Sequence, residues 1–178
     1  MELLLSHDSC TNTELSSDGG RILYFITTPH TLKNLLWTRT VVSRRVLDAR
    51  EPGVEADDIA TIDWHTSKET QVTFRGDTMD IDTFLPKYES SRSFTGPDGR
   101  SYTWRTSRDT MRACHLDVES DKPATVATCR HEVNVITGKK PSLQVDDSVL
   151  NLLDLIVVTW IFVEKDRREE EAKSGGDA

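Results

Sequence analysis

Residues 149–163 read VLNLLDLIVVTWIFV, and this stretch decides the fold of the chain. On a helical wheel, Asn151 and Asp154 fall on one side near its beginning, and apolar residues then surround the axis on every side. A helix that is apolar all round has to be buried on all of its sides. We therefore expect a helix that the rest of the protein encloses.

A buried strand is the rival interpretation, because residues 156–163 are mostly β-branched or aromatic. The apolar stretch of 15 residues is too long for it, since a strand usually has about 5 to 6. The next ten residues favour a helix and pair Glu164 with Arg168 at i,i+4, and residues 146–148 offer a cap. We predict a helix over about 148–168 and a disordered tail at 174–178.

The remainder of the chain predicts β-structure, because short strand-like runs alternate with turn residues. In the clearest hairpin, Gly96-Pro97-Asp98-Gly99 joins 91–95 to 100–105: proline fixes its own φ, and glycine supplies a positive φ. We expect residues 1–5 to form a first strand and the acidic segment 48–58 to form an exposed loop. The other predicted strands are 21–27, 37–45, 59–65, 70–75, 78–82, 113–119, 124–130, 132–136 and 142–145.

The length of the helix suggests what encloses it. Fifteen helical residues span about 22 Å, close to the height of a modest β-barrel. A barrel of about eight strands is filled by its own side chains, whereas about eleven strands leave room for a central helix. We predict a mainly β fold over residues 1–173, a single domain in which a closed antiparallel β-barrel of about 12 strands surrounds a buried hydrophobic C-terminal α-helix. Ligands would then bind at the outer face, rim or loops.

Composition limits the function further. The chain of 178 residues has a net charge of −8, which repels phosphate backbones and argues against nucleic-acid binding. No stretch reaches the length of about 20 apolar residues that a membrane-spanning helix requires. The three cysteines and the absence of an Asn-x-Ser/Thr acceptor favour a reducing setting. We expect a cytoplasmic protein that is soluble or peripheral at membranes.

Two pairs of potential metal ligands occur on predicted strands. Cys114-His115 and Cys129-x-His131 are residue types that zinc accepts. However, Leu116 shares a face with Cys114, whereas Val126 indicates that the opposite parity from Cys129 is buried. The two thiols are therefore expected on different sides of the sheet, so neither a zinc site nor a disulfide is preferred.

Other chemistry-bearing residues carry no recognisable motif. Asp77, Asp80 and Asp82 do not have the spacing of a calcium loop and fit solvent-facing strand positions. The five histidines are scattered, and a nucleophile elbow, a His-Glu-x-x-His helix and a phosphate-binding glycine loop are all missing from the sequence. We assign no catalytic residue, cofactor or metal.

Basic residues give the only candidate binding set: Arg39, Arg44, Arg45, Lys139 and Lys140. Arg39 and Arg45 have the same strand parity and could present an anion-binding face. The sequence therefore favours a non-enzymatic binding or scaffold module, for an anionic lipid headgroup such as a phosphoinositide or for a protein partner. The alternative is an enzyme of unrecognised type with a site at the barrel rim.

Several stretches resemble an uncharacterised fungal domain family that is grouped with the tubby-like and LURP-one-like proteins. They are 20–24 (GRILY), 62–65 (IDWH), 84–86 (FLP), 93–104 (SFTGPDGRSYTW), 153–159 (LDLIVVT) and 163–164 (VE). The resemblance implies a tubby-like fold, a closed barrel of about twelve strands around a hydrophobic C-terminal helix. The family has no established activity. Tubby-like relatives include phosphoinositide-binding and scramblase-related proteins, but their lipid-contacting residues match no positions here.

Overall fold

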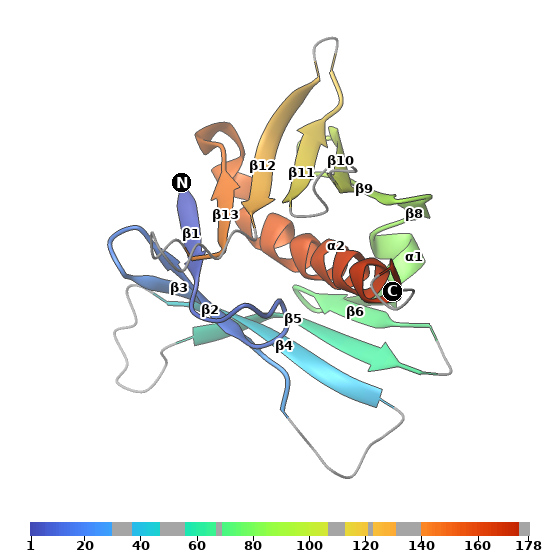
Figure 1. Cartoon of the computed structure of the whole chain (residues 1–178), viewed down its shortest axis with the longest axis horizontal. Helices are drawn as coiled ribbons and strands as arrows, with labels where there is room; N and C mark the ends of the chain where they lie inside the picture. The colour runs from blue at the N-terminus through green and yellow to red at the C-terminus, as the bar shows by residue number, and fades with distance from the viewer. Residues whose placement is uncertain are drawn as a thin grey trace.

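The computed structural model describes residues 1–29, 37–46, 56–66, 69–106, 113–120, 123–130 and 140–174. Within these residues, 13 antiparallel strands form one sheet that curls around a long helix (Figure 1). The strands are β1 (Glu2–Leu5), β2 (Thr13–Ser17), β3 (Ile22–Thr27), β4 (Trp37–Arg45), β5 (Ala56–His65), β6 (Gln71–Phe74), β7 (Asp77–Asp80), β8 (Lys87–Tyr88), β9 (Ser91–Thr95), β10 (Ser101–Thr106), β11 (Ala113–Val118), β12 (Ala124–Arg130) and β13 (Ser142–Val145). The helices are α1 (Ile81–Phe84), the 3₁₀ helix η1 (Asp147–Leu152) and α2 (Leu153–Ser174).

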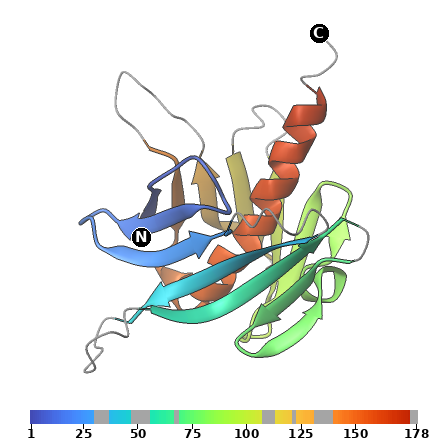
Figure 2. The ribbon, with the colours of Figure 1, turned by 90° about the horizontal axis from the view of Figure 1, so that it is seen from below.

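The mainly β fold and the buried C-terminal helix are confirmed. All residues from Ile156 to Glu164 are buried, so α2 has no solvent-facing side over this length. Figure 2 shows α2 inside the curled sheet, with its last turns extending beyond it. The one hydroxyl in the apolar run is also accommodated: Thr159 Oγ1 accepts a hydrogen bond from Trp104 Nε1 at 3.0 Å and donates to Leu155 O at 2.8 Å.

Both ends of the helix differ from the prediction of 148–168. The Asp146 carboxylate accepts a hydrogen bond from the Ser148 backbone at 2.9 Å, but this cap begins η1 rather than α2. Val149 then leaves helical geometry (φ −120°, ψ 17°), so the α-helix starts only at Leu153. At the other end it continues to residue 174, where the i,i+4 ion pair Arg167–Glu171 supports the extra turns.

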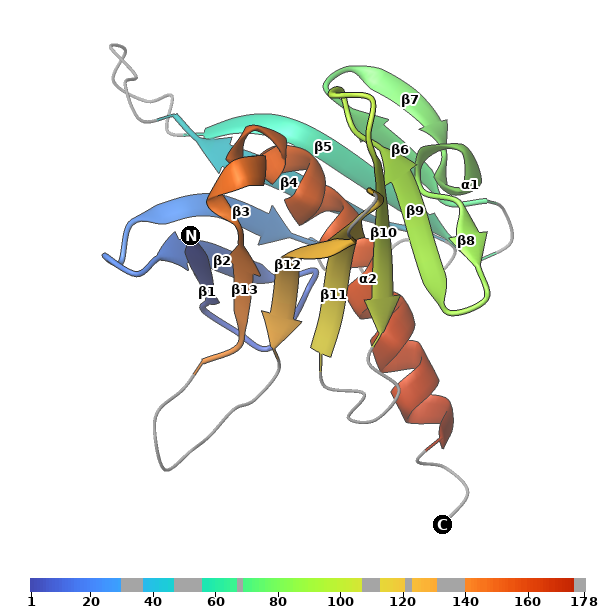
Figure 3. The same cartoon turned by 90° about the horizontal axis from the view of Figure 1, so that it is seen from above.

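The prediction of a closed barrel is wrong. The strand order is β7-β6-β5-β4-β3-β2-β1-β13-β12-β11-β10-β9-β8, so β7 and β8 are free edges instead of partners. Figure 3 shows α1 beside these two edges. The Ile81 backbone N–H bonds Thr70 O at 2.9 Å as the chain turns into α1, and β8 has only two residues. The edges thus lack the length of extended backbone that closing the barrel would need.

The predicted hairpin is confirmed as β9 and β10. Gly96 N donates to Arg100 O at 2.8 Å, and Gly99 has the positive φ of 76° that favours glycine. Tyr102 OH adds a hydrogen bond to the Asp98 carboxylate at 2.7 Å. The turn is therefore fixed by backbone and side chain together.

Other strand predictions need correction. The strand expected at 78–82 ends at Asp80, where α1 begins. Two strands, β2 and β8, were not anticipated, and the start of β5 takes residues 56–58 out of the expected 48–58 loop. The rest of that loop, the strand predicted at 132–136 and residues 175–178 of the tail lie outside the described residues.

Candidate functional site

A pocket of about 320 Å³ opens at the sheet rim where the C-terminal half of α2 emerges. We call it the rim pocket. Its lining includes the aromatic residues Trp37, Trp64 and His65, together with Lys165 from α2. Four threonines complete it: Thr11, Thr28, Thr38 and Thr66. Pockets of this size accept small ligands, and an exposed aromatic wall favours their binding.

The pairing of β4 with β5 positions the two tryptophans. Trp37 lies opposite His65, and Thr38 lies opposite Trp64. Side chains alternate between the two faces of a strand, so the Trp37–His65 pair projects to one face of the sheet and the Thr38–Trp64 pair to the other. The pocket extends around the ends of β4 and β5 from one face to the other. Trp64 packs on Phe162 of α2 with 5.1 Å between ring centroids. Trp37 remains 37% exposed and forms the most accessible apolar surface of the pocket.

A chain of hydrogen bonds fixes the floor of the pocket. Trp64 Nε1 donates to Thr40 Oγ1 at 2.8 Å, and Thr40 Oγ1 lies 2.7 Å from Thr28 Oγ1. Thr28 donates to Thr11 O at 2.9 Å, so its hydroxyl accepts the hydrogen of Thr40. The Trp64 indole N–H is thereby occupied within the protein, and Trp64 offers ligands its ring rather than a donor.

Two cations lie over the indole rings. The Arg39 guanidinium carbon is 5.4 Å from the Trp37 ring centroid, and Lys165 Nζ is 5.2 Å from that of Trp64. Arg39 also binds both carboxylate oxygens of Asp63, at 2.6 and 2.8 Å, a hydrogen-bonded pairing that raises the pKa of Arg39. Lys165 pairs with Glu169. Each cation therefore has its own carboxylate.

A buried carboxylate lies near the N-terminal end of α2. Asp154 accepts a hydrogen bond from Tyr24 OH at 2.7 Å and pairs with Arg44 at 3.2 Å and Arg75 at 3.0 Å. Its side chain is 7% exposed, whereas those of the two arginines are 53% and 62% exposed. Burial first, and then the Asp154 charge, raise the pKa of Tyr24. The arrangement ties α2 to three separate parts of the sheet.

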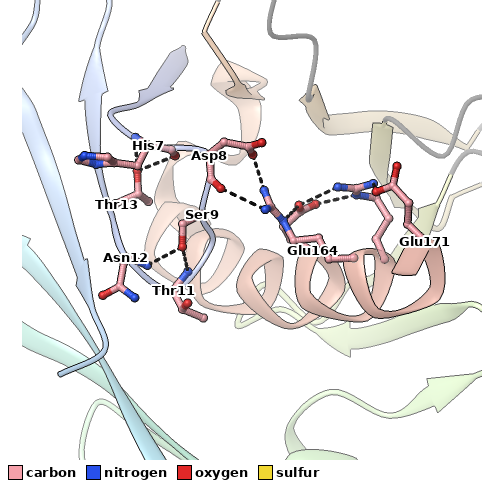
Figure 4. A network of polar contacts seen from close by, with 10 residues as sticks. His7, Asp8, Ser9, Thr11, Asn12, Thr13, Glu164 and Glu171 are labelled. Atoms are coloured by element: carbon pink, nitrogen blue, oxygen red, sulfur yellow. Dashed lines mark hydrogen bonds and ion pairs between the residues drawn. The ribbon is translucent and has the colours of Figure 1, made fainter. Parts of the chain in front are cut away.

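A second buried carboxylate, Glu164, lies further along α2. Its oxygens accept two hydrogen bonds from Arg167, both at 3.0 Å, and it also pairs with Arg168. Arg168 reaches Asp8 in the loop between β1 and β2. Figure 4 shows this loop lying along α2 beside Glu164. The network fixes the loop that contributes Thr11 to the rim pocket.

The cysteines are arranged differently from the prediction. Cys114 and Cys129 are direct cross-strand partners and are both fully buried, so they share the inner side of the sheet. The prediction failed because the β11–β12 register shifts after Leu116, which leaves Val126 as an extra residue and reverses the parity beyond it. None of the three cysteines forms a disulfide. Burial first, and the charge of Glu164 second, raise the pKa of Cys114 to about 12.

No metal site forms from the described residues: no group of three or more His, Cys, Asp or Glu side chains is placed to hold an ion. His131, the histidine closest in sequence to Cys129, lies outside the described residues. Asp77 and Asp80 are on β7, while Asp82 belongs to α1 instead of the expected strand.

The structure does not bring the predicted basic residues together. Arg39 is paired with Asp63 on the outer face, Arg44 reaches Asp154, and Arg45 is exposed at the end of β4. Lys140 is exposed just before β13, and the strands β3, β2 and β1 separate β4 from β13 in the sheet. Lys139 lies outside the described residues.

A larger, more open depression of about 530 Å³ lies beside β12 and β13. Acidic residues, among them Asp18, Asp146 and Asp147, line much of it, and none of its described lining residues is aromatic. The rim pocket therefore offers the better surface for a small ligand. Sequence reasoning missed the rim pocket, although Trp37-Thr38 and Trp64-His65-Thr66 are aromatic and hydroxyl pairs at strand ends.

Comparison with known proteins finds a single kind of relationship. A protein-family model described as a family of unknown function (DUF6593) matches residues 8–169. No curated protein and no solved structure matches the chain. The match confirms a domain of unknown function, while the fungal source and the link to tubby-like proteins stay predictions. Among the described residues, no helix combines the length and hydropathy needed to cross a membrane.

Proposed function

Since this chain belongs to the DUF6593 family, whose function is unknown, we propose a function from its structure: it is a non-enzymatic binding module whose ligand occupies the rim pocket. The observation that carries the proposal is the exposed indole of Trp37 beside a rigid, hydroxyl-lined wall. The interior is filled by α2 from Ile156 to Glu164, so a ligand has to bind near the surface.

The pocket lining favours binding over catalysis. Among the residues that the structure describes, its polar groups are threonine hydroxyls, the His65 imidazole and the Lys165 ammonium, without a carboxylate or a thiol. General acid–base catalysis normally pairs two titratable groups of different pKa. His65 instead lies beside Trp37, with 6.4 Å between their ring centroids.

Fluorine NMR tests the proposal. The protein has four tryptophans, and incorporation of 5-fluorotryptophan gives each a resonance, which Trp→Phe variants assign. We expect members of a library of cationic, anionic, neutral hydroxylated and aromatic small molecules to shift Trp37 and Trp64 saturably. Trp104 and Trp160, each 0% exposed, serve as internal references. If no member of any class moves Trp37 or Trp64 selectively, the proposal fails.

The alternative function, an enzyme at the rim, rests on the His65 imidazole in the lining of this pocket. A small molecule that shifts the Trp37 resonance should be incubated with the protein and analysed by mass spectrometry. Its recovery unchanged supports a binding module. Its conversion to a product, lost in His65→Gln, would support the enzyme.

A phosphoinositide or other anionic lipid surface is a weaker form of the binding proposal, because Arg39 and Arg44 already have carboxylate partners. Vesicles with and without phosphoinositides test it by co-sedimentation. Binding that is lost in Arg45→Glu combined with Lys140→Glu would favour the lipid. We also propose a cytoplasmic location, because none of the three cysteines forms a disulfide.

A further inference from the structure

We propose that the ligand of the rim pocket is a neutral carbohydrate, whose ring packs its C–H face on Trp37 while its hydroxyls bond to threonines of the lining. This inference rests on the proposed function, since it names the ligand class of the same pocket. It follows from three properties of the pocket: where its cations lie, how they are paired, and which polar groups remain to meet a ligand.

A cationic ligand does not fit, although tryptophans often bind one. Arg39 lies over Trp37 and Lys165 over Trp64, at 5.4 and 5.2 Å from the ring centroids. One face of each indole thus already holds a cation from the protein. A quaternary ammonium or lysine-like ligand would meet two positive charges where an aromatic cage presents none.

An anionic ligand is disfavoured for a different reason. Arg39 uses Nε and Nη2 to bind Asp63 in a two-bond geometry, at 2.6 and 2.8 Å. Lys165 is paired with Glu169. An anion would have to displace these carboxylates or lie beside them, and each like-charge contact would cost binding free energy.

A neutral hydroxylated ring matches what remains. Threonine hydroxyls both donate and accept, so Thr11 and Thr38 suit ligand hydroxyls in either role. An indole face carries negative charge density that attracts the slightly positive C–H face of a sugar ring. The chain Trp64–Thr40–Thr28–Thr11 holds the floor rigid before binding, which lowers the entropy lost in the complex.

A proline-rich peptide is the nearest competitor, since it also packs on tryptophan. Such peptides bind in the extended form along aromatic-lined grooves. The Trp64 indole N–H donates to Thr40 and is not offered to a peptide carbonyl. The hydroxyl-rich lining and the volume of about 320 Å³ suit a compact polar ring better than an extended chain.

The fluorotryptophan protein tests the ligand class directly. The probes are maltotriose, cellotriose, laminaritriose and chitotriose as neutral sugars; trigalacturonic acid as an anion; choline as a cation; and a decaproline peptide. We expect at least one neutral sugar to shift Trp37 saturably without moving Trp104 or Trp160. Trp37→Ala should weaken that sugar about tenfold or more, because it removes the ring on which the sugar packs.

A matched control removes another exposed aromatic residue. Tyr88 is 66% exposed on β8 and does not line the pocket, so Tyr88→Ala should leave sugar binding as it is. Unmoved Trp104 and Trp160 resonances in Trp37→Ala would show that the variant folds. Shifts caused only by charged probes or decaproline would overturn the carbohydrate inference and leave the binding module standing. If neither these probes nor the wider library moves Trp37, both fall.

Discussion

Helix α2 carries two buried carboxylates, and their partners come from different places. Glu164 is bound by Arg167 and Arg168 of its own helix, three and four residues away. Asp154 is bound by Tyr24, Arg44 and Arg75, which are 130, 110 and 79 residues away. The arginines that bind Glu164 lie on its own helix, although Arg168 also reaches Asp8 outside it, whereas the partners of Asp154 come together only when the sheet has wrapped around the helix.

The two clusters also differ in solvation. Arg167 is 4% exposed, so removal of Glu164 would take away a carboxylate partner from a buried cation. Arg44 and Arg75 are more than half exposed, and water can replace Asp154 around them. Removing a charge should therefore cost more at Glu164 than at Asp154, although Asp154 joins more distant parts of the chain.

The largest effect is expected from Glu164→Ala. Loss of this carboxylate should lower the free energy of unfolding by about 3–5 kcal/mol, because a buried ion pair is broken on one side only. Urea titration followed by circular dichroism measures it. Glu169→Ala is the matched control: this side chain is 51% exposed, and its removal should cost less than about 1 kcal/mol. Equal losses in the two variants would contradict the buried role of Glu164.

Asp154→Asn should have a smaller effect, a loss of about 2 kcal/mol. Asparagine keeps an acceptor for Tyr24 OH, while the exposed arginines regain water. The same urea titration measures it, with Asp57→Asn, an exposed carboxylate on β5, as the control. A loss as large as that of Glu164→Ala would show that solvation does not distinguish the two clusters.

Alkaline pH should weaken the Glu164 end of the helix before the Asp154 end. Burial raises the pKa of Cys10 to about 11 and of Cys114 to about 12, above the ordinary 9.0. The unfolded chain therefore loses these protons first, and stability that is complete below pH 9 falls as the pH rises. At pH 10 each of these two thiols should have lowered the free energy of unfolding by about 1.4 kcal/mol. Tyr24, whose ordinary pKa is 10.0, has lowered the free energy of unfolding by only about 0.4 kcal/mol at pH 10.

Urea midpoints at pH 8, 9 and 10 check this order. Cys114→Ala should reduce the decline between pH 8 and pH 10 by the share of one thiol, and Tyr24→Phe should reduce it by less than half as much. A flat profile up to pH 10 would show that the thiols ionise as readily in the folded protein as in the unfolded chain.

The smallest effect is expected from Arg75→Ala, a loss below about 1 kcal/mol, because its ion pair with Asp154 is exposed on the arginine side. Arg44 keeps Asp154 paired in this variant. The double variant Arg44→Ala, Arg75→Ala should lose more than the sum of the single variants, since only it leaves the buried carboxylate without a cation. Additive losses would mean that Tyr24 and solvent suffice for Asp154.

This contrast also explains how much of the fold could be predicted. The Glu164–Arg168 pair, the helix and the β9–β10 hairpin depend on residues close in sequence, and all three were anticipated. The partners of Asp154 depend on how the strands pack around the helix, and the sequence near Asp154 predicted none of them. One extra residue, Val126, reversed the expected side of Cys129, and no local pattern showed that β7 and β8 would stay unpaired edges.

Prediction from the sequence was less successful still for the rim pocket. Charge and spacing directed attention to Arg39, Arg44 and Arg45, but exposure and pairing decide what a surface can bind. Trp37 and Trp64 are 27 positions apart, and only the β4–β5 register brings Trp37 opposite His65 and Trp64 opposite Thr38. Long-range pairing therefore creates the rim pocket, and a local sequence pattern cannot reveal it.

The unclosed edge at β7 has a consequence for self-association. Unpaired strand edges can recruit a strand from another copy of the same chain. On β7, however, only two residues separate Asp77 from Asp80, so an antiparallel second copy would bring carboxylates of the two chains together. With just two residues, β8 offers too little backbone for a stable partner. We therefore expect neither edge to recruit a second copy readily, although the sheet is open.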